Sequence, residues 1–174
     1  MEINVTSIKS GLPGITSVAA SQLYEAFEVC MHTSGHAEKV GLSMAGITNN
    51  SINLLWADEY NGQKERTYAD MQYTVEHGAV CLSVMLSTAL TPYTVIERSR
   101  KGTGIDYWLG DKDSVLFQKK ARLEVSGILK GNNYDINRRY DAKVEQIQRS
   151  NGLQLPAFVS VIEFSYPRAI FNKR

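Results

Sequence analysis

Two acidic residues stand inside apolar, strand-like segments in the second half of the chain. Asp106 lies within Gly-Ile-Asp-Tyr-Trp-Leu-Gly (104–110), and Glu124 lies within Ala-Arg-Leu-Glu-Val-Ser-Gly (121–127). Burying a carboxylate costs free energy unless a cation or hydrogen-bond donors accompany it. Two carboxylates a few ångströms apart also repel each other unless a cation lies between them, and Mg²⁺ prefers such oxygen ligands. If the two segments pair as a hairpin, Asp106 and Glu124 converge, and we expect them to bind Mg²⁺ or Mn²⁺.

Polar side chains continue along one face of the strand that carries Glu124. Residues two apart in a strand share a face, so this face consists of Lys120, Arg122, Glu124 and Ser126. In the helix predicted next, positions i, i+4, i+8 and i+11 form a second polar face, made of Asp135, Arg139, Lys143 and Gln146. We expect the two faces to meet, so that Arg139 and Lys143 reach the carboxylates or a phosphate group. Without a metal, the alternative is a buried ion-pair network of the two acids with Arg122, Arg139 and Lys143.

Glu76 is the single acid in the apolar segment from Met71 to Leu90, which has the composition of a buried helix. Gly78 follows it and would let another group approach closely. We therefore expect Glu76 to be a third acid of the site. The structural alternative is an ion pair with Arg98 or Arg100.

The order of predicted elements indicates the fold class. Periodicity and turn residues predict helices over 17–33, 68–89 and 134–149, and strands over 40–45, 52–57, 93–99, 104–110, 117–127 and 157–164. Residues 1–16 are expected to form an extended arm and a turn, and the basic tail 166–174 to be partly ordered at most. This order predicts an α/β fold with a single mixed β-sheet flanked by helices. No linker is evident, so 174 residues favour one domain, in which 1–66 add a helix and a hairpin to a core of 67–165.

The core resembles a known superfamily. A helix with Glu76, three strands bearing Asp106 and then Glu124, a helix and a strand resemble the αβββαβ core of the PD-(D/E)xK, or restriction-endonuclease-like, nucleases over roughly residues 68–165. The resemblance implies metal-dependent hydrolysis of phosphodiester bonds, with DNA as the substrate. It further implies that Glu76, Asp106 and Glu124 hold Mg²⁺ or Mn²⁺ and that a lysine positions the attacking water.

That lysine is displaced in this chain. Ser126 stands where the Glu-x-Lys motif has lysine. The superfamily relocates this lysine in some members, sometimes to the next helix. Lys143 is the first candidate for its role, and Lys120, on the same strand face as Glu124, is the second.

Local basic residues offer contacts to nucleic acid. The net charge of +1 provides no global attraction to phosphates. Arg98, Arg100 and Lys101 form a cluster beside Asp106, and with Arg139 we expect them to contact a nucleic-acid backbone.

The remaining features bound the function classes. Two cysteines without a disulfide framework, Cys30 and Cys81, favour a reducing cytoplasm, and neither a signal peptide nor a membrane-spanning segment is predicted. Cys30, His32 and His36 have half of a zinc-site spacing, but a cysteine in an apolar helix is usually core. The alternative function is a catalytically inactive nuclease-fold protein, a binding or assembly subunit of a phage-defence, restriction or toxin–antitoxin system. Such a protein would bind a protein partner or self-associate.

Overall fold

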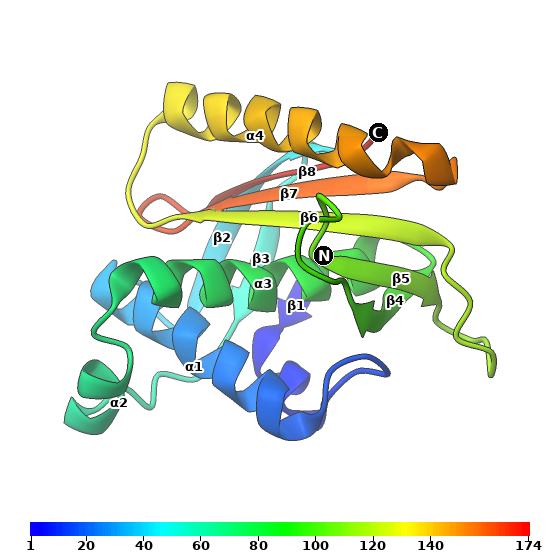
Figure 1. Ribbon diagram of the computed structural model, residues 1–174. Coiled ribbons are helices and arrows are strands. Elements are labelled where there is room, and N and C mark those ends of the chain that lie inside the picture. Colours follow the sequence, from blue (N-terminus) through cyan, green and yellow to red (C-terminus); the bar gives the residue numbers. More distant parts are fainter.

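An eight-stranded mixed β-sheet runs through the molecule, with helices on both faces (Figure 1). The computed structural model describes residues 1–174, apart from the side chains of Arg149, Asn151 and Leu153. The strands are β1 (Glu2–Asn4), β2 (Lys39–Gly46), β3 (Ile52–Leu55), β4 (Tyr93–Arg98), β5 (Tyr107–Asp111), β6 (Ala121–Ile128), β7 (Ala157–Glu163) and β8 (Arg168–Lys173). The α-helices are α1 (Ser17–Thr33), α2 (Gly62–Thr67), α3 (Met71–Leu90) and α4 (Asn133–Ile147), and the 3-10 helices are η1 (Val5–Ser10) and η2 (Gln148–Leu153). The strand order is β1-β3-β2-β8-β7-β6-β5-β4.

The strand pairings confirm the predicted α/β class with one mixed sheet. β4, β5 and β6 form an antiparallel meander, and β7 pairs with β6 in parallel. A parallel pair needs a crossover connection, which α4 supplies here. The predicted hairpin of β2 and β3 is present, and β2 pairs with β8 in parallel.

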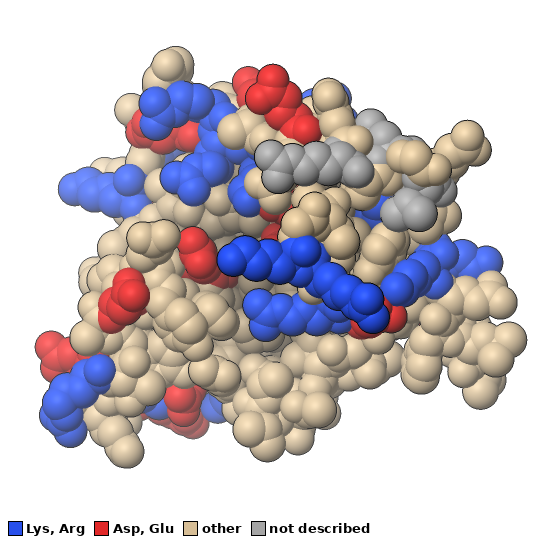
Figure 2. All heavy atoms as spheres, viewed as in Figure 1, with Lys and Arg blue, Asp and Glu red and all other residues tan. Residues whose placement is uncertain are grey.

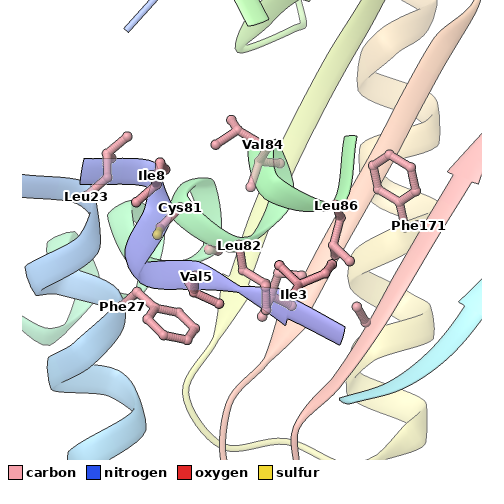
Figure 3. Packing of buried hydrophobic residues seen from close by; sticks show 14 of the residues in the cluster. Ile3, Val5, Ile8, Leu23, Phe27, Cys81, Leu82, Val84, Leu86 and Phe171 are labelled. Carbon is pink, nitrogen blue, oxygen red and sulfur yellow. The ribbon is translucent and has the colours of Figure 1, made fainter. Parts of the chain in front are cut away.

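The main core lies between the sheet and the helices α1 and α3 (Figure 1). Phe27 of α1 and Leu82 of α3 are buried in it, together with side chains of the sheet (Figure 3). Gly78 makes the helix contact close, because a Cβ there would lie 3.1 Å from the Phe27 Cα. Replacing such a core side chain by alanine typically costs about 2–5 kcal/mol.

Helix α4 covers the other face of the sheet. An Asn132–Asp135 capping box begins it, and Ile136, Tyr140 and Ile147 form its buried stripe. These side chains belong to a second core cluster with Val159 and Val161 of β7. The resulting orientation leaves one flank of α4 beside β6, where the polar residues of the candidate site lie.

The C-terminal tail was expected to be partly ordered, and this prediction is wrong. Residues 168–173 form β8, which lies inside the sheet between β7 and β2. Phe171 is fully buried in the main core (Figure 3), while Ile170 packs on the α4 side. Arg168 Nε donates to the buried Glu163 carboxylate at 3.1 Å. Charged residues at both ends therefore give this segment the composition of a solvated tail, although the residues at its centre are apolar on both faces of the strand.

The N-terminal arm also differs from the prediction. Its first residues form β1, which pairs in parallel with β3. Val5 and Ile8 of η1 are buried against the main core (Figure 3). The short helix α2 was not predicted.

Several boundaries shift as well. Helix α1 begins at Ser17, as predicted, after the N-cap Thr16, whereas α3 begins at Met71 after the N-cap Asp70. The long strand begins at Ala121 rather than at 117, because Val115, Leu116 and Phe117 lie in an exposed loop. Within the part of the chain that the structure describes, no helix has both the length and the apolar composition needed to cross a bilayer.

Candidate functional site

The candidate site lies where β5 leaves the edge of β6. The β5–β6 pairing covers only Ala121 to Leu123, whereas β6 continues to Ile128. Asp106 precedes β5, and its backbone N–H donates to the Leu123 carbonyl at 2.9 Å. Its carboxylate Oδ2 then accepts a hydrogen bond from the Val125 N–H at 2.8 Å. The Asp106 side chain thus takes the place of the next backbone partner along β6.

Glu124 points to the α4 side of the sheet and is only 1% exposed. Its Oε1 accepts two hydrogen bonds, from Lys143 Nζ at 2.5 Å and from Gln146 Nε2 at 2.7 Å. Its Oε2 is buried and has no hydrogen-bond partner among the described residues. A buried carboxylate oxygen without a donor is costly, so this atom is a place where a cation would stabilise the protein.

The pKa of Glu124 is consistent with the lack of a partner at Oε2. Burial raises the pKa of Glu124 to about 7, and the neighbouring Asp106 carboxylate raises it further, while Lys143 opposes the shift. Asp106 raises this pKa both through its charge and through a side-chain hydrogen bond that favours the protonated Glu124 carboxyl. A second positive charge at this point would favour the ionised form of Glu124.

A cavity of about 260 Å³ opens beside these residues. Its lining includes Glu76 on α3, Asp106 before β5, and Arg139 and Lys143 on α4. Glu124 is not among the lining residues, because it lies deeper in the structure. The fold therefore brings the predicted site residues to one place, with Asp106 and Lys143 at the surface of the cavity.

Glu76 has a looser connection to the site than expected. It is exposed and takes part in none of the ion pairs found among the described side chains, so the expected pairing with Arg98 or Arg100 is not seen. No group of three or more His, Cys, Asp or Glu residues in the described part of the chain is placed to hold a metal ion. The two neighbouring carboxylates are therefore those of Asp106 and Glu124, and Glu76 lines the same cavity as Asp106.

The expected polar network is only partly formed around Glu124. Arg139 Nη1 donates to Ser126 Oγ at 3.2 Å, so Arg139 bonds the residue that replaces the motif lysine. Arg122 donates to the Leu155 carbonyl and to Ser150 Oγ near η2. Lys143 is the cation that reaches Glu124.

The other predicted cations border the site. Arg98 lines the central cavity, and Arg98, Arg100 and Lys101 line an adjoining cavity of about 390 Å³ beside Asp106 and Gln146. Figure 2 shows Lys and Arg side chains gathered across the middle of this face, between the regions of α3 and α4.

Two residues of the site were not assigned roles from the sequence. Gln146 bonds Glu124, and its position three residues after Lys143 on the same helix face was the available signal. His77 also lines the cavity, and its position next to Glu76 in the sequence was the available signal. Its Nδ1 donates to the Tyr73 carbonyl at 2.9 Å, and its ring stacks on the Tyr73 ring at 3.8 Å. Since a carbonyl only accepts, this bond leaves Nε2 as the free nitrogen of the neutral ring.

The half zinc spacing has no metal-binding role in the structure. Cys30 is buried in the main core, as expected, and burial raises the pKa of its thiol to about 12. His32 pairs with Asp58, and His36 Nε2 bonds the Phe164 carbonyl.

Comparison of the chain with protein-family models, with curated proteins and with solved structures finds no match.

Proposed function

We propose that the protein is a metal-dependent nuclease that hydrolyses phosphodiester bonds, with DNA as the substrate. The observation that carries this proposal is Glu124 Oε2, a buried carboxylate oxygen that lacks a donor among the described residues. It belongs to a residue whose pKa the neighbouring Asp106 carboxylate helps to raise. A divalent cation between the two acids would give Glu124 Oε2 a partner and would offset the repulsion between the two carboxylates.

The order of elements supports the proposal. Helix α3, the meander β4–β5–β6, helix α4 and the parallel strand β7 follow the αβββαβ order of the restriction-endonuclease-like core. Glu124 lies within the third strand of the meander, as the PD-(D/E)xK resemblance implies, whereas Asp106 precedes the second strand by one residue instead of lying on it.

Asp106 and Glu124 fit a hard divalent ion because both supply carboxylate oxygens. Mg²⁺ or Mn²⁺ would take further ligands from water, and Glu76 in the lining of the same cavity is the third acid available to it. Such an ion lowers the pKa of a bound water and stabilises the negative charge that develops on the phosphate.

Lys143 and the other basic residues have different roles in the proposed nuclease. Lys143 holds Glu124 Oε1 and lines the cavity, so it takes the role of the lysine missing at Ser126. Lys120, the second candidate, is exposed and precedes β6, and it is not among the lining residues. Arg139, Arg98, Arg100 and Lys101 would orient the phosphate backbone.

The proposal is tested by DNA cleavage with Mg²⁺ or Mn²⁺, comparing the wild type with Asp106→Asn. The amide keeps an oxygen that can accept the Val125 N–H but removes the negative charge. We expect cleavage to fall by at least about 100-fold, while Asp141→Asn, an exposed position on α4, stays within about twofold of wild type. Equal activity in Asp106→Asn, or no cleavage by the wild type with either metal, would contradict the proposal.

A second candidate function is a catalytically inactive binding subunit. The exposed loop favours it, because Val115, Leu116 and Phe117 are 93%, 67% and 63% exposed, and consecutive exposed apolar residues often mark a contact surface. Light scattering after size exclusion tests self-association. A stable oligomer that dissociates in Phe117→Ser, together with absent metal binding, would favour this function over the nuclease.

A further inference from the structure

Three cavities join into one trough along the open edge of β6. The 390 Å³ cavity shares Arg98 and Asp106 with the central cavity of 260 Å³. The central cavity shares Glu76 and Arg139 with a third cavity of about 500 Å³, which follows Gly127 to Leu129. The trough therefore continues on both sides of the acid pair and does not end there.

The walls of the trough are set by the sheet and its helices. Because β5 pairs only as far as Leu123, the rest of β6 has no strand beside it on this edge. Helix α3 forms one wall and α4 the other (Figure 1). Gly127 allows α3 to lie against β6, since a Cβ there would be 2.5 Å from the Val75 carbonyl oxygen.

The chemistry of the trough suits a chain that carries a phosphate on every unit. Arg98, Arg100 and Lys101 lie at one end, and Arg139 borders the other two cavities. The opposing charges in the lining are Glu76 and Asp106, two of the three proposed metal ligands. The band of basic side chains in Figure 2 crosses this face.

A stacked imidazole ring accompanies these cations. The His77 ring lines the central cavity and is held against Tyr73, whose hydroxyl accepts a hydrogen bond from Gln22 at 2.7 Å. Grooves that bind single strands combine a basic track for the backbone with rings on which bases stack.

We propose that this trough binds a single strand of nucleic acid in preference to a duplex, an inference that rests on the proposed nuclease function. Glu124 is 1% exposed and lies beneath the lining of the central cavity, the floor of the trough. A flexible strand can lower one phosphate between the two walls while its bases splay apart. A duplex keeps its phosphates on the outside of a stiff rod, and the two helices hold that rod away from the floor.

The test is fluorescence anisotropy with one labelled 16-nucleotide DNA, used single-stranded and as its duplex, in EDTA so that no cleavage occurs. We expect the single strand to bind at least about 10-fold more tightly. Arg98→Ala and Arg139→Ala should each weaken single-strand binding at least about threefold and lessen its salt dependence. The control Arg66→Ala, on the exposed helix α2 outside the trough, should bind like wild type.

Equal or tighter binding of the duplex would overturn the inference, as would unchanged binding in both trough variants. These outcomes differ from failure of the nuclease proposal. Single-strand binding without metal-dependent cleavage refutes the nuclease and keeps the trough, whereas cleavage of duplex alone keeps the nuclease and refutes the trough assignment.

Discussion

Lys143 on α4 donates to Glu124 Oε1 on β6 at 2.5 Å, which joins the helix to the sheet at the acid pair. The Lys143 side chain is 21% exposed and that of Glu124 is 1% exposed, so the ammonium group lies between the buried acid and the cavity. This contact distinguishes Lys143 from Lys120, the other candidate for the missing motif lysine.

Replacing Lys143 should therefore separate the two candidates. Lys143→Met keeps much of the apolar stem but removes the charge, so the pKa of Glu124 should rise further above its ordinary value. We expect metal-dependent cleavage to fall by about 100-fold or more, a loss in the range of a removed electrostatic partner in catalysis. Lys120→Met is the matched control and should retain at least about half of the activity. The reverse pattern in initial rates would assign the role to Lys120.

Glu124 should make the protein less stable as the pH rises. Its pKa is raised from 4.5 to about 7 in the folded state. Between these values the folded protein holds a proton that the unfolded chain has released, so the free energy of unfolding falls through this window and levels off above it. The loss is at most about 3.5 kcal/mol, from about 1.4 kcal/mol per pKa unit.

Urea unfolding at pH 5 and pH 7.5 measures this effect, with Glu124→Gln as the reference that cannot titrate. The wild type should lose more stability than the variant between the two pH values, and added Mg²⁺ should restore part of it at pH 7.5. Parallel pH profiles for the two proteins would contradict the assignment of a buried, titrating Glu124.

The hydrogen bond from the Val125 N–H to Asp106 predicts a structural effect beside the chemical one. Asp106→Ala should lower the free energy of unfolding by about 1–3 kcal/mol, because it leaves that N–H without its partner. Asp106→Asn should cost less, since its amide oxygen still accepts. Chemical denaturation of both variants at pH 7.5 tests this order, and an equal or larger loss in the asparagine variant would contradict a stabilising role for this hydrogen bond.

Gly127→Ala should disturb the trough through packing. The added Cβ would lie 2.5 Å from the Val75 carbonyl oxygen, so α3 must move or strain. We expect a loss of about 1–3 kcal/mol in stability and weaker single-strand binding. The comparison is Gly62→Ala in α2, whose nearest neighbour is 3.4 Å away at the end of the Arg66 side chain. Equal stability of the two variants would mean that α3 adjusts without cost.

The sequence predicted the parts of the fold that local patterns control. The helices α1, α3 and α4 have apolar stripes or caps, and the β2–β3 hairpin has a polar turn, so their existence follows from nearby residues. Strand β8 was missed because its charged ends resemble a solvated tail. It pairs with β7, which just precedes it, and also with β2, which lies more than a hundred residues earlier. Nonlocal pairing of this kind depends on the whole sheet.

The candidate site likewise contains some features that local patterns predicted and others that they did not. Strand and helix periodicity placed Glu124 and Lys143 on faces that meet, and the structure joins them. The role of Asp106 as a partner for the Val125 N–H depends on where β5 ends, which no local pattern indicated. Glu76 was chosen as an unusual acid in an apolar helix, but its face of α3 is exposed and lacks an ion-pair partner among the described residues.

Calorimetric titration with Mn²⁺ and Mg²⁺ tests the central claim most directly, because it needs neither substrate nor activity. The nuclease proposal predicts a saturable site in the wild type at pH 7.5 that is lost in Asp106→Asn and in Glu124→Gln and kept in Asp141→Asn. The absence of binding in the wild type, or binding that survives in both site variants, would contradict a metal site at Asp106 and Glu124.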